Sequence, residues 1–381
     1  MPQDHTPDAV PKSVELVASA AEEHGFALLG ITAAQASPYA GHVRKWLADG
    51  HHGEMGYLAD TLETRLDPTK FLPGAKAIIA IADQHASHPP ASPPPPGPMG
   101  RIARYAWNDD YHKTIKRRLH VLADALRMRW PASQFRGCVD TAPVLEREHA
   151  ARAGLGWIGK HTLLIHPRLG SWFLLGQIVT THGFDDISPT PVADHCGTCT
   201  RCIDACPTDC IAPEGYTLDA TRCISYLTLE HRSSITPSLH SAMGAWVAGC
   251  DVCQEVCPFN RPQEKSPAEP IPVPDPTADE PQRPLHQLDL IEVLGWGAED
   301  RTRAFRRSAL KRIKLDPLRR NALIALGNHV PTCHPTEAKR LLTLIRSMVA
   351  DPNETALVRS TAEQVLQRVA PPDTPSSPPS C

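Results

Sequence analysis

The cysteines constrain this chain more than any other feature of its sequence, because nine of the twelve lie between residues 196 and 257. The first run has the spacing C-x2-C-x2-C-x3-C-P and contains Cys196, Cys199, Cys202 and Cys206. The second run keeps the later intervals and the proline but stretches its first interval to 26 residues, and it contains Cys223, Cys250, Cys253 and Cys257. Both runs are typical of thiolates that hold iron–sulfur clusters.

In bacterial ferredoxins with this spacing, the fourth cysteine of each run ligates the cluster held by the other run. The crossing predicts one 4Fe–4S cluster on Cys196, Cys199, Cys202 and Cys257, and another on Cys206, Cys223, Cys250 and Cys253. Two structural zinc sites are the alternative, but zinc motifs do not require a proline after the fourth cysteine of both runs. Cys210 is expected to be a buried or spare thiol, and three cysteines have no partner at ligand spacing: Cys138, Cys333 and Cys381.

Length and charge limit what surrounds this cysteine-rich segment. A chain of 381 residues exceeds the roughly 250–300 that one hydrophobic core usually serves, so at least two packed units are expected. The net charge of −3 means that any nucleic-acid surface must be local. No apolar run approaches the roughly 20 residues that cross a bilayer. The first residues lack a secretory pattern, so we expect a cytoplasmic protein without a membrane contact.

Apolar periodicity predicts an α+β chain in several parts. An α/β domain is expected over residues 1–185, with helices at 13–25, 111–129 and 144–153 and strands at 27–31, 77–82 and 172–180. A ferredoxin-like iron–sulfur domain over 186–265 and a Pro-rich linker over 266–284 follow. Residues 285–370 are expected to form a domain of α-helical, HEAT-like repeats, with helices at 304–315, 316–329, 335–349 and 353–370. A disordered tail is expected over 371–381.

Six short segments together resemble one enzyme family. Asp140 begins the segment Asp-Thr-Ala-Pro-Val-Leu-Glu-Arg, and Gly154 begins Gly-Leu-Gly-Trp-Ile-Gly-Lys, whose glycines predict a loop with a backbone that closely approaches an unknown ligand. The other segments lie at residues 53–57, 223–231, 249–251 and 320–328. With the stretched cysteine run, they resemble the epoxyqueuosine reductases, which are cobalamin-dependent iron–sulfur enzymes similar in their core to reductive dehalogenases.

The resemblance implies reductive deoxygenation of epoxyqueuosine to queuosine at the wobble position of tRNA. Electrons would pass from the two 4Fe–4S clusters to cobalamin bound by the domain at 1–185. The resemblance also implies an external low-potential electron donor, a tRNA partner and a monomer. The alternatives are a corrinoid reductive dehalogenase of small organohalides and a ferredoxin-like electron carrier. The basic helical domain counts against the first, and the long α/β domain with Asp140 counts against the second.

The resemblance places the proton donor on Asp140, whose carboxyl would need a raised pKa to protonate the departing epoxide oxygen. From the residues alone, Asp140 is better interpreted as a helix N-cap, because Pro143 and Glu146 follow as at a helix start. The resemblance reverses this preference. The implied cobalamin contacts fall on Arg65, Tyr105, Asp140, Leu164, Leu175, Ser225 and Asp251. The implied tRNA contacts fall on Tyr226, Glu230 and Arg232.

A basic stripe runs from Arg301 to Arg320, with nine basic residues against one acidic residue, Asp316. Charge runs are usually solvated helix faces, but here the opposite charge is nearly missing. The stripe therefore predicts a surface for RNA phosphates, with Lys311 and Arg312 as candidate contacts.

Overall fold

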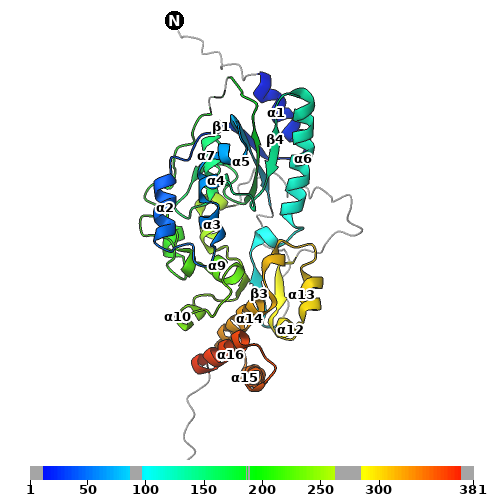
Figure 1. Ribbon diagram of the computed structural model, residues 1–381. Helices are drawn as coiled ribbons and strands as arrows, with labels where there is room; N and C mark the ends of the chain where they lie inside the picture. Colours follow the sequence, from blue (N-terminus) through cyan, green and yellow to red (C-terminus); the bar gives the residue numbers. More distant parts are fainter. Residues whose placement is uncertain (1–11, 86–96, 186, 188, 262–284, 370–381) are drawn as a thin grey trace, which may run out of the picture.

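The computed structural model describes residues 12–85, 97–185, 187, 189–261 and 285–369. The linker expected at 266–284 and the tail expected at 371–381 lie outside the described residues. The molecule is elongated, with one sheet and its helices at one end and the last helices at the other (Figure 1). Among the described residues, no helix combines the length and the apolar character that crossing a bilayer requires.

The first sheet has four strands in the order β1-β2-β7-β4, and every neighbouring pair is antiparallel. The strands are β1 (Leu28–Ala33), β2 (Ala77–Gln84), β7 (Phe173–Thr180) and β4 (Phe135–Cys138). Residues 77–82 of the central strand β2 form a continuous apolar run, and all six are buried, as expected for a strand covered on both faces. Helices α1 (Lys12–Glu23) and α6 (Tyr111–Arg129) pack on one face, and α7 (Glu146–Arg152) packs on the other (Figure 1).

A second sheet, in the order β8-β3-β9, joins three distant parts of the chain: Trp246–Ala248 (β8), Met99–Ile102 (β3) and Gln287–Asp289 (β9). Its side chains share one core with α9 (Ile224–Leu229), α12 (Leu290–Leu294) and α14 (Leu315–His329). The predicted α+β class is confirmed. The antiparallel first sheet corrects the expectation of an α/β unit. The domain boundaries stay predictions, and β3, inside the range 1–185, pairs with strands outside it.

At the far end, α14 and α15 (Pro335–Ala350) both pack on α16 (Ala356–Val369). The helix expected at 304–315 is wrong, because α13 (Ala298–Ala304) ends there and only a 3-10 turn, Ala309–Arg312, follows. The guanidinium group of Arg301 donates to the carbonyl groups of Lys311 and Ile313, which therefore do not need a helical partner.

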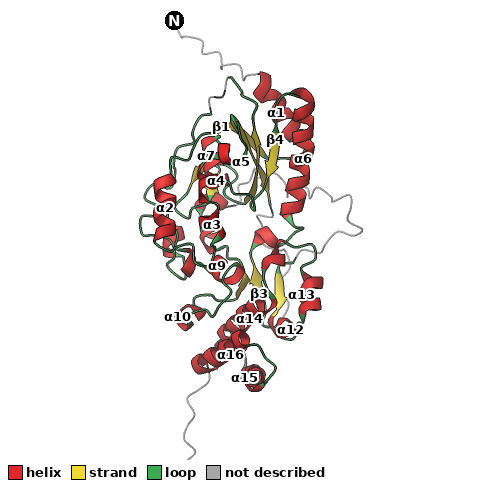
Figure 2. Cartoon of the chain, viewed as in Figure 1, coloured by secondary structure: helices red, strands yellow, loops and turns green. Residues whose placement is uncertain are grey.

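Short elements make up most of the remaining chain, and Figure 2 shows that strands are few beside helices and loops. The short helices are α2 (Ala40–Ala48), α3 (Tyr57–Asp60), α4 (Leu62–Leu66), α5 (Pro68–Phe71), α8 (Arg201–Asp204), α10 (Pro237–His240) and α11 (Val252–Glu255). The short strands β5 (Trp157–Ile158) and β6 (Leu164–Ile165) pair with each other. The loops between these short elements position the side chains of the candidate site.

Candidate active site

The two cysteine runs fold into two groups of thiols. In the first group, Cys257 from the second run lies with Cys196 in one apolar cluster that includes Trp157. Burial raises the pKa of the Cys202 thiol to about 11, and the charges of Cys196, Cys257 and Cys199 add to the rise. Thiols that oppose one another's ionisation fit a site where a positively charged iron cluster would hold them as thiolates.

The second group contains the other four predicted ligands. Burial raises the pKa of the Cys250 thiol to about 12, and the charges of Cys223 and Cys206 contribute. Burial also raises the pKa of Cys253, with contributions from Cys250 and Cys223. Cys210 is buried, and its Sγ lies 3.4 Å from the Sγ of Cys206. The fold thus gathers both predicted sets, while the assignment of each thiol to an iron stays a prediction.

The predicted backbone-approach segment supports the first cysteine loop. A Cβ atom at Gly156 would lie 2.1 Å from the carbonyl oxygen of Ile165, so only glycine allows β5 and β6 to approach here. Lys160 Nζ donates to the carbonyl groups of Gly197 at 2.7 Å and Cys199 at 3.0 Å. The segment therefore holds the loop that carries three of the cysteines.

Asp140 follows β4 in a tight loop, where its φ of 37° lies in the left-handed region. Its Oδ2 accepts a hydrogen bond from the Tyr111 hydroxyl at 3.0 Å and lies 2.9 Å from His112 Nε2. Its backbone N–H donates to Glu146 Oε1 at 2.8 Å. Because α7 begins at Glu146 with Leu145 as its N-cap, the interpretation of Asp140 as a helix cap is wrong.

The pKa shifts around Asp140 favour a proton on its neighbours and not on Asp140 itself. Burial disfavours the ionised form of Asp140, but hydrogen bonds from His112 and Tyr111 outweigh it and lower its pKa below the ordinary 3.8. Burial also disfavours charged His112, but hydrogen bonds to Asp110 and Asp140 raise the pKa of His112 to about 9. Burial and the charge of Asp140 raise the pKa of Glu146 to about 8. The raised pKa expected for Asp140 is therefore wrong for this arrangement, in which His112 and Glu146 hold protons at neutral pH.

Some residues predicted to contact cobalamin and others predicted to contact tRNA surround Asp140. The ring of Tyr105 meets the ring of Tyr111 edge-on, at 6.1 Å between centroids. Burial raises the pKa of Tyr105, while the charge of Arg312 lowers it and that of Asp140 raises it further. Arg312 forms an ion pair with Glu230. Burial lowers the pKa of Arg65, and the charges of Tyr57 and Asp140 oppose this shift. Asp140 therefore lies among cations and phenols.

The other predicted cobalamin residues are less available. Asp251 is buried, and its carboxylate accepts the backbone N–H of Arg104 at 2.8 Å. This hydrogen bond engages one carboxylate oxygen, and the cobalamin contact of Asp251 stays a prediction. Leu164 is buried, and Leu175 and Ser225 are half-buried.

Two of the predicted tRNA residues hold a turn of the protein. Tyr226 is only 6% exposed, and its hydroxyl accepts the backbone N–H of Glu54 at 2.7 Å. A Cβ at Gly53 would lie 2.3 Å from this hydroxyl oxygen, so the phenol fills the space beneath the turn. The tRNA contact expected for Tyr226 stays a prediction, and its phenol is largely enclosed by the protein. The backbone N–H of Arg232 donates to Glu54 Oε2 at 2.6 Å, and its guanidinium lies 4.0 Å from Glu230.

The basic stripe is not one continuous surface. Arg320 is fully buried and donates to the carbonyl groups of Leu227, His231 and Ser233. Arg319 pairs with Glu354 at 2.6 Å. The prediction of a phosphate surface along the whole stripe is therefore wrong. Its exposed cations are Arg303, Arg306, Arg312 and Lys314, and Lys311 is half-exposed.

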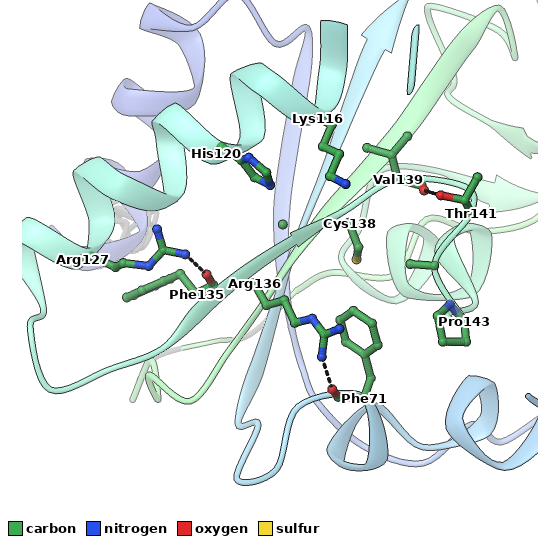
Figure 3. A pocket seen from close by; sticks show the side chains of 12 residues that line it. Phe71, Lys116, His120, Arg127, Phe135, Arg136, Cys138, Val139, Thr141 and Pro143 are labelled. Carbon is green, nitrogen blue, oxygen red and sulfur yellow. Dashed lines mark hydrogen bonds between the residues drawn. The ribbon is translucent and has the colours of Figure 1, made fainter. Parts of the chain in front are cut away.

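A pocket of about 420 Å³ lies between α6 and β4, beside the loop that follows Asp140 (Figure 3). Two of its arginines are engaged, because Arg127 donates to the Phe135 carbonyl and Arg136 donates to the Phe71 carbonyl at 2.8 Å. Asp140 and its hydrogen-bond partners are not among its lining residues. The pocket is therefore separate from the candidate active site.

Sequence reasoning missed the partners of Asp140. Tyr111 and His112 begin a helix 28 or 29 residues earlier, and nothing in the spacing ties them to Asp140. Glu146 lies inside the Asp140 segment but was interpreted as part of a helix start. The one available signal was the placing of polar Asp110, Tyr111 and His112 together at the start of an amphipathic helix.

Two groups of thiols with ferredoxin-like spacing, in one chain with the acid–base group around Asp140, are typical of an iron–sulfur oxidoreductase. The comparisons agree with this class. Residues 195–260 match a 4Fe-4S double cluster binding domain, and residues 65–141 match the family described as Epoxyqueuosine reductase QueG, DUF1730. An epoxyqueuosine reductase from Synechococcus sp. is 37% identical over 339 residues, which cover 87% of this chain and 99% of that protein. This chain belongs to the epoxyqueuosine reductase family.

Other relatives extend the match. The epoxyqueuosine reductase from Pseudomonas aeruginosa is 35% identical over 355 residues, covering 91% of each chain. The structure of epoxyqueuosine reductase from Streptococcus thermophilus superposes with a TM-score of 0.80 at 27% identity, covering 96% of this chain and 92% of that one. The structure of the Bacillus subtilis enzyme, with a TM-score of 0.81 at 25% identity, covers 95% of this chain and 91% of that one. It is described as having a catalytic aspartate loop swung out of the active site.

Proposed function

We propose that this protein removes the epoxide oxygen of epoxyqueuosine in tRNA and thereby forms queuosine. The near-full-length family match carries this proposal, and the Asp140 group supplies the acid–base chemistry that the reaction needs. Loss of the oxygen as water consumes two electrons and two protons. The double-cluster domain is the electron route within the chain, and an external low-potential donor would refill it.

We propose that Cys196, Cys199, Cys202 and Cys257 hold one cluster, and Cys206, Cys223, Cys250 and Cys253 the other. The grouping of Cys257 with the first run supports this crossed arrangement. Cys210 would stay a thiol, because eight ligands are already provided. Cys202 and Cys257 are buried and the other six predicted ligands are half-buried, so both groups are partly shielded from water.

Cobalamin is the proposed acceptor of these electrons, and when bound it would supply a reduced metal that attacks carbon. One orphaned group fits this amide-rich ligand. His161 Nδ1 accepts the backbone N–H of Leu163 at 3.2 Å, so its Nε2 carries a proton, and this buried atom has no hydrogen-bond partner in the described part of the chain. Arg65 and Tyr105 would hold the ligand beside Asp140, with Leu164, Leu175 and the backbones of Ser225 and Asp251 at its edges.

We propose that Asp140 delivers the proton to the departing oxygen. Asp140 is ionised in this arrangement, so it must first take a proton, and charged His112 lies within hydrogen-bonding distance to give one. The Tyr111 hydroxyl and the Glu146 carboxyl fix the side chain and the backbone of Asp140. A swung-out catalytic aspartate loop in the Bacillus subtilis relative supports a role for this loop.

The function is tested directly with the purified chain, both clusters intact, mixed with cobalamin, a chemical low-potential reductant and an epoxyqueuosine tRNA stem loop. Nucleoside analysis should show queuosine. A matched reaction without cobalamin should show none. Absence of queuosine from protein that has bound both clusters and cobalamin would contradict the proposal.

A pH prediction follows from His112, whose pKa in the folded protein, about 9, is above its ordinary 6.5. The interaction of charged His112 with Asp140 is complete below the ordinary value and is lost as pH rises through the folded value. Turnover at saturating tRNA should therefore fall above about pH 9. His112→Asn should lower neutral turnover by about 10–100-fold and remove this limb. His120→Asn, on the same helix, is the control, and equal profiles for all three proteins would refute the role.

For tRNA, we propose that the exposed cations near Glu230 hold phosphates at the entrance to the site. A relative with a TM-score of 0.78 is described in complex with an epoxyqueuosine-modified tRNA stem loop, which supports this partner. Arg312 is 39% exposed beyond its ion pair with Glu230, and Lys311 lies 3.6 Å from Asp110. Arg232 would contribute to the same surface.

Replacing Lys311 and Arg312 together with alanine should weaken tRNA binding and flatten its salt dependence by about 1–2 units in log–log slope, because each phosphate contact releases counterions. Turnover at saturating tRNA should change much less. The control is the double variant Lys45→Ala with Arg129→Ala. Both cations are exposed, and they belong to α2 and α6, which Figure 1 shows at the other end of the molecule from α14. If the salt dependence of tRNA binding by the Lys311/Arg312 variant equals that of the wild type, these two residues do not contact phosphates and the phosphate surface lies elsewhere on the protein.

Three further points stay proposals. They are the monomeric state, the cytoplasmic location and the HEAT-like character of the last helices. The packing of both α14 and α15 on α16 supports a layered helical unit, although its expected first helix is missing.

A further inference from the structure

Three ligand-type side chains from the turn between α14 and α15 meet at the helical end of the molecule. The ligand atoms of His329, Cys333 and Glu337 all lie within 4.8 Å of one another. This group is outside both cysteine runs and outside the Asp140 group. The sequence analysis found no partner for Cys333 at ligand spacing.

The local fold explains why these three side chains lie close together. His329 is the last residue of α14, Cys333 follows the 3-10 turn Val330–Thr332, and Glu337 lies in the first turn of α15. The chain reverses over these residues, so positions four residues apart face one point. The Cys333 thiol has only a weak contact, 3.4 Å from the Val330 carbonyl oxygen.

One atom of the group has an unmet requirement. His329 Nε2 is buried and makes no hydrogen bond with any residue that the structure describes. The nearest carboxylate oxygen, Glu337 Oε1, is 3.7 Å away, which is too long for a hydrogen bond. Two ligands of a tetrahedral zinc ion stand roughly 3.3–3.6 Å apart when each lies about 2.0–2.2 Å from the metal. The separation therefore suits a metal between the two side chains better than a direct contact.

We propose that His329, Cys333 and Glu337 bind one Zn²⁺ ion, with water in the fourth position. A nitrogen, a thiolate and a carboxylate together favour zinc over Mg²⁺ or Ca²⁺, which take oxygen ligands. On binding, the Cys333 thiol loses its proton to solvent, and no oxidation state changes. The ion links the end of α14 to the start of α15 and so stabilises the turn between them.

The site is tested by zinc content, which does not depend on turnover or on the proposed function. Holoprotein with both clusters is dialysed against micromolar Zn²⁺, and zinc and iron are measured in the same sample. The wild type should hold one zinc per chain in addition to its iron. Cys333→Ser and His329→Asn should each weaken zinc binding about tenfold or more without loss of iron.

His334→Asn is the matched control, because His334 Nδ1 only accepts the Thr336 N–H at 3.3 Å and asparagine also caps helices well. Its zinc content should equal that of the wild type. Circular dichroism checks that each variant is folded, and Glu337→Gln serves as a third ligand variant if another loses helix. Wild-type protein without this extra zinc, or folded ligand variants that keep it, would overturn the proposal.

Discussion

Asp140→Asn is expected to lower turnover by about 10²–10⁴-fold while the protein keeps its fold and its clusters. Asparagine cannot donate the proton of a carboxylic acid, but its carbonyl oxygen can still accept the hydrogen bond from Tyr111. It also tolerates the left-handed backbone at this position, where φ is 37°. The variant therefore removes the acid and leaves the loop intact. The measurement is single-turnover formation of queuosine at saturating tRNA.

Glu146→Gln is the comparison that isolates this effect. Glu146 is protonated at neutral pH, because burial and the charge of Asp140 raise its pKa to about 8. A neutral glutamine should therefore mimic it and still accept the Asp140 backbone N–H, with less than about a tenfold change in turnover. If Glu146→Gln is as inactive as Asp140→Asn, the proton donor is Glu146. If Asp140→Asn turns over like the wild type, Asp140 has no acid role.

Cys257→Ser is expected to remove the first cluster, although Cys257 belongs by sequence to the second run. Iron should fall from roughly eight to roughly four atoms per chain, because one 4Fe–4S cluster loses a ligand. Turnover should be abolished, since electrons then lack one of the two centres. Iron analysis and electron paramagnetic resonance of the reduced protein measure the loss, and spectra that show the second cluster missing instead would contradict the crossed assignment.

Cys210→Ser provides the control for a buried thiol close to a cluster. Cys210 Sγ is 3.4 Å from Cys206 Sγ. This variant therefore tests whether a thiol that lies close to the predicted ligands, but outside the ligand spacing, is needed for iron binding. Its iron content should equal that of the wild type. Stoichiometric zinc with little iron in the wild-type protein would instead show that the cysteines form zinc sites.

Predictions from local pattern were the most accurate. The apolar period over Tyr111–Arg129 predicted α6 with its observed bounds, and the apolar run beginning at Ala77 predicted β2. Both depend on neighbours a few residues away, which the sequence displays directly. The helix predicted at 304–315 failed because the side chain of Arg301 binds carbonyl groups that a helix would have used, and a periodic pattern contains no such competitor.

The sequence by itself determined the family and the cysteine runs, because both depend on residue identity at fixed spacing, and it named Asp140 as the proton donor only through the family resemblance. Only the tertiary structure decided which side chains are charged and which are exposed for contact with a ligand. Hydrogen bonds to Asp110 and Asp140 raise the pKa of His112, and His112 lowers the pKa of Asp140 because α6 brings its Nε2 within 2.9 Å of the Asp140 carboxylate. Arg320 lies in the core and not on the surface of the basic stripe, because its guanidinium group donates hydrogen bonds to three carbonyl groups there. Contacts between distant segments fix such properties, since burial and charge act through space and not along the chain.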